Sequence, residues 1–296
     1  MYGALIHYLI HMKYLLLGLA LFSFLQLGAQ SPSRLGVVTH LDHDSLLATQ
    51  GYTAITESTR RLLSPHSVSE AAFDSLLPRI KGAALPIIAC NLFLPTELRV
   101  VGPEVDAKAV LTYTEQVFRR AQRAGIELIV WGSSGSRAVP EGYSRVTATA
   151  QFIRMARRVA EQAERYDVTL AVENLNSGES NFMTTLSEAL AVVRAVDHPH
   201  LRLCVDLYHM LREGEPASAL RGVGPYAVYA ELAEPADRTP PGVEGTDFVP
   251  YLQALSDEGY SGPLMIEARW GALGEQGGAA ARILRTQLHQ AGAKQE

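Results

Sequence analysis

Several features that would identify other classes of protein are scarce in this sequence. It has only two cysteines in 296 residues, Cys90 and Cys204, too few for a disulfide-stabilised scaffold. Each lies in an apolar, strand-like run, so we expect two buried free thiols. Positive charge is also scarce, because the formal net charge is -5 and nucleic-acid binding depends on lysine and arginine neutralising phosphates. We therefore expect no nucleic-acid partner.

Long hydrophobic runs are absent except near the N-terminus. There, Met12-Lys13 is followed by an apolar run from Tyr14 to about Leu27 and then by Gly28-Ala29, an order typical of a secretory signal. The run is shorter than the roughly 20 residues that span a bilayer, so a stable membrane anchor is the less favoured alternative. We expect residues 1–29 to be a signal peptide, with Met12 as a candidate start, and the protein to be periplasmic or secreted.

The rest of the chain, residues 30–296, alternates short apolar runs with longer amphipathic segments. Segments 107–124 and 146–165 carry apolar residues at every third or fourth position, which predicts helices. The short runs, rich in β-branched residues, predict eight strands. These are Leu35–Thr39, Tyr52–Glu57, Pro86–Asn91, Glu127–Trp131, Thr169–Glu173, Leu201–Asp206, Ala227–Ala233 and Pro263–Glu267.

Eight strands joined by crossover helices predict one α/β domain, a (β/α)₈ TIM barrel over residues 30–296, because about 260 residues is the usual size of such a barrel. The alternative is an open, doubly wound sheet. That fold usually has a glycine-rich phosphate loop after its first strand, whereas Thr39-His40-Leu41-Asp42 stands here. We therefore favour the barrel.

Four carboxylates come at the ends of the last four predicted strands. They are Glu173, Asp206, Glu231 and Glu267. In a barrel the strand ends converge on the active site, and converging carboxylates repel one another unless they are protonated or share a cation. An all-oxygen ligand set favours Mn²⁺ or Mg²⁺ over Zn²⁺ or Cu²⁺. Each carboxylate alone could instead cap a helix or form an ion pair.

These strand ends carry a family resemblance. The segments Val172–Asn176, Cys204–His209 and Ile266–Trp270, with Ala89–Pro95 and Trp131–Pro140 upstream, resemble the sugar phosphate isomerase/epimerase family. That family has the xylose isomerase-like TIM barrel and includes ketose 3-epimerases such as those acting on D-tagatose and D-psicose. The resemblance implies a small sugar as substrate, one divalent metal, commonly Mn²⁺, and is compatible with a homodimer.

The resemblance also implies a ligand set, and the sequence departs from it at one position. Glu173, Asp206 and Glu267 match three of the family's four metal ligands. The family's strand-seven pattern, His-x-His-x-Ala-Glu, supplies the fourth, but this chain has Tyr229 to Glu234 with Glu231 in the place of the metal histidine. Either Glu231 binds the metal, or metal binding is weakened or lost and the protein is a non-catalytic sugar-binding relative.

By the same resemblance, Glu173 and Glu267 are the paired bases, and His209, Glu179 and Arg238 contact the substrate. The implied reaction is isomerisation or epimerisation by proton transfer through an enediolate, as two opposed bases and a metal allow. A metal-dependent lyase or hydratase of oxidised sugars would use the same carboxylates and is the alternative.

Three further residues have two interpretations each. Arg137, after a Gly/Ser-rich turn, could bind an anionic group or lie in a flexible loop. Trp131 and Trp270 end strands and could stack on a sugar ring or pack at the barrel rim.

Overall fold

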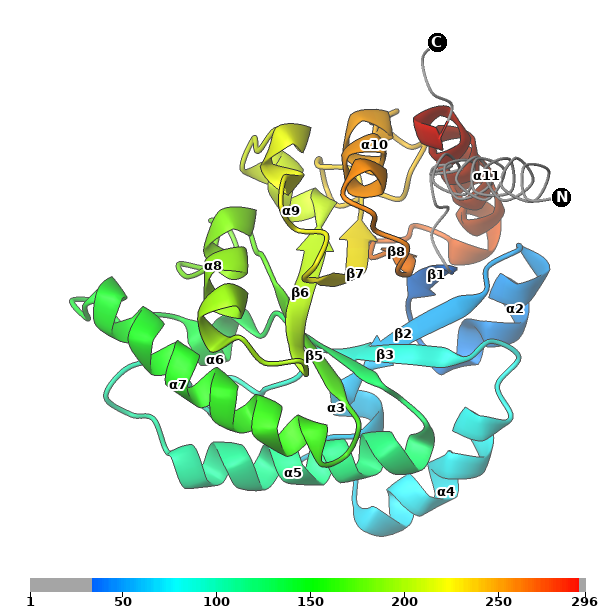
Figure 1. The fold of residues 1–296 in the computed structure, drawn as a ribbon. Helices are drawn as coiled ribbons and strands as arrows, with labels where there is room; N and C mark the ends of the chain where they lie inside the picture. Colours follow the sequence, from blue (N-terminus) through cyan, green and yellow to red (C-terminus); the bar gives the residue numbers. More distant parts are fainter. Residues whose placement is uncertain (1–33, 293–296) are drawn as a thin grey trace, which may run out of the picture.

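The structure, a computed structural model, describes residues 34–292. Its centre is a closed barrel of eight parallel strands in sequential order, β1 to β8 (Figure 1), so the predicted (β/α)₈ fold is confirmed. The predicted signal peptide, residues 1–29, lies outside the described residues.

All eight predicted strands are present, and their ends differ from the predicted ones by no more than two residues. β5 and β6 begin and end where the sequence predicts. The bounds are β1 Leu35–Val38, β2 Ala54–Ser58, β3 Ile87–Asn91, β4 Leu128–Trp131, β5 Thr169–Glu173, β6 Leu201–Asp206, β7 Ala227–Leu232 and β8 Leu264–Ile266.

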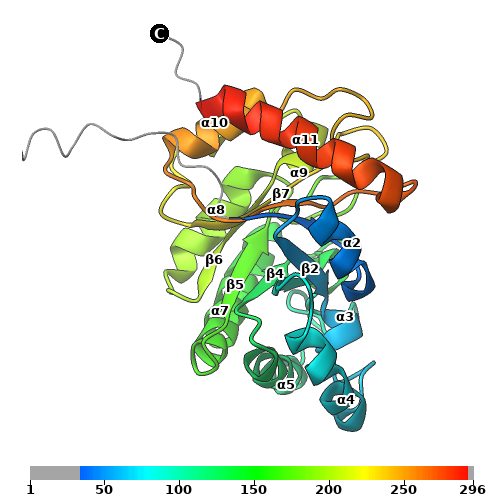
Figure 2. The ribbon, with the colours of Figure 1, turned by 90° about the vertical axis from the view of Figure 1, so that its right-hand side faces the viewer.

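Helices surround the barrel, and among the described residues none has the length and apolar character needed to cross a bilayer. Figures 1 and 2 show α5 and α7 side by side on one flank, with α10 and α11 packed together on another. The helices are α2 Asp44–Thr49, α3 Thr59–Leu62, α4 Glu70–Lys81, α5 Ala107–Ala124, α6 Ser134–Arg137, α7 Arg145–Glu164, α8 Leu186–Val196, α9 Leu207–Arg212, α10 Val249–Asp257 and α11 Leu273–Gly292; short 3₁₀ helices span Leu41–His43 and Ala217–Leu220.

Capping residues set the bounds of the long helix α5. The Asp106 side chain accepts hydrogen bonds from the backbone amides of Lys108 and Ala109, and Gly125 takes a left-handed conformation (φ 73°) at the other end. A side-chain acceptor at the start and a glycine just past the end are the usual helix boundaries. The predicted span 107–124 is confirmed.

Two layers of apolar side chains fill the structure, one between the strands and the helices and a smaller one inside the barrel. The inner layer comprises Ala54, Ala89, Val130, Ala171, Cys204, Tyr229 and Met265. Both cysteines are buried and free, as expected. Cys204 belongs to the inner layer and Cys90 to the outer one, so they lie on opposite faces of the sheet.

An ion pair between a buried carboxylate and a partly exposed guanidinium joins the first βα unit to α4. Asp44 is 2% exposed, and its two oxygens accept from the Arg79 guanidinium at 2.8 and 2.9 Å. It also accepts from the backbone amide of Ala84 at 2.7 Å. These bonds, led by that from Arg79, hold the pKa of Asp44 far below its ordinary value.

We expect Asp44→Asn to lower the free energy of unfolding by about 2 kcal/mol at neutral pH, because charge-assisted bonds to a buried group are lost. Since the folded pKa is depressed, this stabilisation is present above the ordinary pKa of about 3.9 and is lost as the pH falls below it. Chemical denaturation at pH 7 and pH 3 measures both effects. Asp74→Asn, which removes an exposed partner of Arg123, is the matched control; an equal loss there would contradict the prediction.

Candidate metal and substrate site

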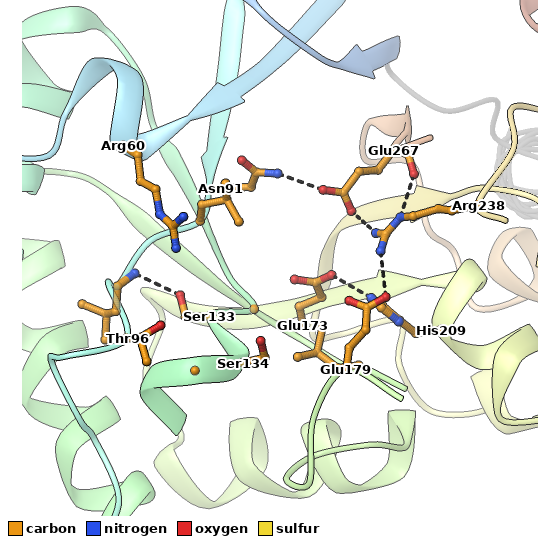
Figure 3. A pocket seen from close by; sticks show the side chains of 15 residues that line it. Arg60, Asn91, Thr96, Ser133, Ser134, Glu173, Glu179, His209, Arg238 and Glu267 are labelled. Atoms are coloured by element: carbon orange, nitrogen blue, oxygen red, sulfur yellow. Dashed lines mark hydrogen bonds and ion pairs between the residues drawn. The ribbon is translucent and has the colours of Figure 1, made fainter. Parts of the chain in front are cut away.

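A pocket opens at the C-terminal ends of the strands, where barrel enzymes carry their active sites. Its cavity volume is about 200 Å³, below the range of roughly 300–1,000 Å³ typical of sites for drug-sized ligands. Five residues that the sequence singles out line it together (Figure 3): Glu173, Glu179, His209, Arg238 and Glu267. The fold therefore brings residues from four different βα units to one place.

Four carboxylates gather at this pocket. One oxygen from each of Glu173, Asp206, Glu231 and Glu267 lies within 4.8 Å of the others. Strand alternation explains the convergence, because each acid comes two residues after a side chain of the inner core layer and so points to the same inner face. Parallel register completes it: Asp206 lies beside Glu231, and Glu231 beside Met265.

Burial and mutual repulsion favour protons on two of these acids. Glu231 is 1% exposed, and burial, followed by the negative charges of Glu267, Glu173 and Asp206, raises its pKa well above the ordinary value. Burial also raises the pKa of Glu267 to about 7, although Arg238 opposes the rise. The cluster thus stores electrostatic repulsion that a divalent cation would relieve.

The donor set fits such a cation. Glu231 Oε1 is buried and has no hydrogen-bond partner among the described residues, while Glu231 Oε2 accepts a weak hydrogen bond from the Cys204 thiol at 3.7 Å. A buried, unsatisfied carboxylate oxygen is costly unless something binds it. Its place among three other acids is the geometry of a hard-cation site.

Asn176 fixes the tautomer of His209. The Asn176 Oδ1 accepts from the backbone amide of Gly178 at 2.9 Å, which orients the amide so that its Nδ2 donates to His209 Nδ1 at 2.8 Å. The ring proton is then on Nε2, 3.4 Å from both Glu173 Oε1 and Asp206 Oδ2. Although burial opposes it, Asp206 and Glu173 raise the pKa of His209.

Arg238 reaches the carboxylates from the loop after β7. Its guanidinium lies 3.4 Å from Asp206 Oδ2 and 3.3 Å from Glu179 Oε1, and it forms an ion pair with Glu267. It also lies over the Tyr208 ring, 4.4 Å from the centroid. Arg238 and Glu179 thus both line the pocket. Their roles in binding a substrate stay predictions.

Buried Glu234 holds the loop that carries Arg238. It is 0% exposed, and its oxygens accept from the backbone amides of Gly242, Gly245 and Thr246 at 2.8 to 3.1 Å. The loop residue Arg238 itself has a positive φ of 56°, an uncommon conformation for a side chain of this size. The hydrogen bonds of the Glu234 carboxylate therefore stabilise the loop in this strained conformation.

Three residues of the site were missed by the sequence analysis. Asn91 ends β3 and donates to Glu267 Oε1 at 2.9 Å, so the same strand-end criterion that found the acids would have found it. Asn176 and Gly132 act through contacts between elements far apart in the chain, for which the sequence has no local signal.

Gly132 is required by the position of Glu173. A Cβ at residue 132 would lie 2.1 Å from Glu173 Oε2, far inside van der Waals contact. We expect Gly132→Ala to displace that carboxylate and to lower divalent-metal affinity by roughly 10- to 100-fold, the size seen when groups supporting a metal ligand are altered. Calorimetric titration with Mn²⁺ measures this. Gly274→Ala, where the nearest atom is 3.9 Å away, is the control, and unchanged affinity in Gly132→Ala would refute the steric argument.

The anion-binding interpretation of Arg137 and the sugar-stacking interpretation of Trp131 are wrong, and the packing alternative for Trp131 is confirmed. Arg137 does not face an anion: it is fully buried and donates to the backbone oxygens of Trp131 at 3.1 Å and Glu173 at 2.8 Å, so it braces the strand ends. Trp131 is fully buried in the outer core, because it follows the inward-facing Val130 and strand alternation turns it away from the barrel axis. Trp270 also packs against the outer core.

The fold is a (β/α)₈ barrel with a cluster of four acids at its strand ends, which could hold a metal ion. Residues 45–287 match the family model for the xylose isomerase-like TIM barrel. The chain belongs to this family.

Similar proteins of known name include sugar epimerases. D-psicose 3-epimerase of Ruminiclostridium cellulolyticum is 27% identical over 170 residues, which are 56% of this chain and 57% of the epimerase. D-psicose 3-epimerase of Enterocloster bolteae is 31% identical over 119 residues, 40% of this chain and 39% of the epimerase. The match thus spans less than two thirds of either relative.

Solved structures support the fold. A structure of L-ribulose 3-epimerase superposes with a TM-score of 0.72 at 21% identity, covering 90% of this chain and 97% of the other. D-psicose 3-epimerase from Clostridium cellulolyticum with D-tagatose superposes with a TM-score of 0.68 at 20% identity, covering 88% and 93%.

Proposed function

We propose that this protein is a metal-dependent sugar isomerase or epimerase that transfers a proton through an enediolate. The convergence of Glu173, Asp206, Glu231 and Glu267 within 4.8 Å at the pocket carries the proposal. The ketose epimerases among the relatives favour a ketose or related saccharide as the small-molecule substrate. A homodimer is part of the proposal, by the resemblance alone.

Glu173, Asp206, Glu231 and Glu267 would hold the metal, with Mn²⁺ as the preferred ion and Mg²⁺ as the second choice, because all four donors are oxygens. A bound divalent cation supplies electrostatic stabilisation of the negative charge that develops on the enediolate oxygens. Glu231 takes the place of a histidine in this set, which makes the set harder and more negative.

The remaining chemistry falls to side chains around the pocket. Glu173 and Glu267 are the two bases, one removing the proton next to the carbonyl and the other returning a proton to the opposite face. His209, whose Nε2 carries the ring proton, would donate to a substrate oxygen near the reacting carbons. Glu179 and Arg238 would bind hydroxyl groups of the sugar.

Two measurements on the purified protein test the proposal. Elemental analysis should find one Mn²⁺ or Mg²⁺ per chain, and ketoses incubated with the protein in D₂O should exchange the proton next to the carbonyl. Metal with loss of water or of a glycosidic group would instead support the lyase or hydratase alternative. Absence of metal would support a non-catalytic sugar-binding relative, which the missing histidine at Glu231 motivates.

Export to the periplasm or the medium is a further part of the proposal, supported only by the sequence of residues 1–29. N-terminal sequencing of the protein from its native cell should begin near Gln30. A mature protein that begins at Met1 or Met12 would contradict it.

A further inference from the structure

We propose that the side of the pocket formed by residues after β2, β3 and β4 binds an anionic group of the substrate, a carboxylate or a phosphate. This group would lie on the end of the sugar far from the reacting carbons, and Arg60 would bind it. The inference rests on the proposed sugar chemistry at the carboxylate cluster and adds the charge class of the substrate. It would make Arg60 a specificity-determining residue.

Charge is divided across the pocket. Its acidic lining residues, Glu173, Glu179 and Glu267, come from β5 and β8 and the loops after them, whereas the lining residues that follow β2, β3 and β4 include no acid. Arg60 lies on that second side, at the start of α3, near Thr96 and Ser133 and across the pocket from Arg238 (Figure 3). A substrate that fits both halves therefore meets the carboxylates at one end and a positive charge at the other.

Of the two arginines that line the pocket, Arg60 and Arg238, the exposed Arg60 is the one that forms no ion pair within residues 34–292. Among the described residues its guanidinium has no carboxylate within ion-pair distance, whereas the neighbouring Arg61 lies 3.6 Å from Glu57 and 3.8 Å from Asp42. Glu97, the acid next to the pocket residue Thr96, is 67% exposed and lies 3.6 Å from His66, which pairs with it only when the imidazole is protonated. Arg238, on the other side, is already engaged by carboxylates.

The wall facing Arg60 is preformed. The backbone amide of Leu94 donates to Ser133 Oγ at 2.9 Å, and the Arg99 guanidinium donates to Gly135 O at 2.7 Å. Gly135 lets the Thr96 side chain lie directly against the backbone, because a Cβ there would meet Thr96 Oγ1 at 2.3 Å. These contacts join the loops after β3 and β4 into one surface.

Hydroxyl groups on this surface complete a site for an anion. Thr96 and Ser134 line the pocket, and among the described residues neither hydroxyl has a hydrogen-bond partner. A guanidinium offers several donors in one plane, which suits the oxygens of a carboxylate or phosphate, and two hydroxyls add neutral donors. An anionic sugar end would form an ion pair with the exposed guanidinium of Arg60, and a neutral sugar end would not.

Ligand binding to the Mn²⁺-loaded protein tests which charge class of sugar the pocket prefers, independently of whether a reaction follows. Calorimetric titration compares D-fructose with D-fructuronate and D-fructose 6-phosphate, which share carbons 1 to 5 and differ in the group at carbon 6. We expect at least one of the two anionic sugars to bind about tenfold more tightly than D-fructose, the size of one charge-assisted contact. Which of them gains identifies carboxylate or phosphate.

Arg60→Met should abolish this preference and change D-fructose binding by less than about twofold, while Arg60→Lys should retain part of it. Arg61→Met removes the same charge one residue away, outside the pocket lining, and should bind like the wild type. Equal affinity for all three sugars would overturn the inference. A preference that survives in Arg60→Met would also overturn it, because the anion would then lie on the metal cluster.

Proton exchange in D₂O, measured on the same samples, tests the proposed function separately. Arg60-dependent binding without exchange on any of the three sugars would uphold the anion site and count against the epimerase chemistry. If the exchange rate depends neither on the charge of the sugar nor on Arg60, the epimerase chemistry is supported and the anion site is contradicted.

Discussion

Glu267→Gln is expected to slow exchange of the substrate proton next to the carbonyl by about 10²- to 10⁴-fold, the contribution typical of a general base. An amide cannot accept the proton, whereas the Glu267 carboxyl, with its pKa raised to about 7 chiefly by burial, is suited to give and take one near neutral pH. Glu173→Gln should have an effect of the same order, because each base serves one face of the substrate. Exchange into D₂O, followed by NMR, measures the rate.

Both acids are also proposed metal ligands, so the metal content of each variant must be measured beside its rate. Glutamine keeps one carbonyl oxygen for the cation, and Asn91 Nδ2, which donates to Glu267 Oε1 at 2.9 Å, can still orient it. Glu97→Gln, an exposed acid outside the pocket lining, is the control for loss of one negative charge. Wild-type exchange in Glu267→Gln with metal bound would remove Glu267 from the mechanism.

Glu231→His is expected to change the metal preference rather than to abolish metal binding. The wild-type set of four carboxylates should favour Mn²⁺ and Mg²⁺, and an imidazole nitrogen in the place of Glu231 should favour Zn²⁺. In Glu231→His we expect the ratio of Zn²⁺ affinity to Mn²⁺ affinity to rise by at least about tenfold. Glu231→Ala removes a ligand outright, so it should weaken Mn²⁺ binding by more than the roughly 10- to 100-fold loss seen when a group that only supports a ligand is altered. Competition calorimetry of both ions measures this.

Unchanged Mn²⁺ affinity in Glu231→Ala would show that Glu231 is not a ligand. Glu97→Gln again serves as the control, since it removes a charge without touching the cluster. Cys204→Ser offers a second comparison, because it changes the group that donates to Glu231 Oε2 and leaves all four carboxylates in place.

Metal affinity should also increase with pH. In the metal-free protein burial raises the pKa of Glu267 to about 7, and burial together with the acidic neighbours raises the pKa of Glu231 well above its ordinary value. Protons therefore compete with the cation for these carboxylates, and binding must displace them. Mn²⁺ affinity measured by calorimetry should rise from pH 6 to pH 8, and an affinity independent of pH would argue against a cation held by these two acids.

The sequence was sufficient for the fold because its signals are local. Each strand is a short apolar run between amphipathic segments, so β5 and β6 could be placed to the residue. The four carboxylates could be found for the same reason, since a polar residue that ends a buried parallel strand has to lie at the mouth of the barrel. Alternation along each strand then fixes which residues point inward.

Local pattern could not decide what distant segments do to each other. Arg137 is as polar in the sequence as Arg60, but packing buries the first beneath the strand ends and leaves the second on the pocket. Trp131 ends its strand as Glu173 does, yet its register turns it into the core under the helices. The tautomer of His209 depends on Asn176, 33 residues away.

The sequence by itself thus determined the barrel, its eight strand ends and the identity of the four acids, because these follow from hydrophobic periodicity within a few residues. Only the tertiary structure decided that the acids share a site within 4.8 Å, that Gly132 makes room for Glu173, that Glu234 holds the Arg238 loop and that Arg60 joins the pocket. Those outcomes depend on close packing between segments far apart in the chain, where a single methyl group or an uncompensated charge is enough to change the result.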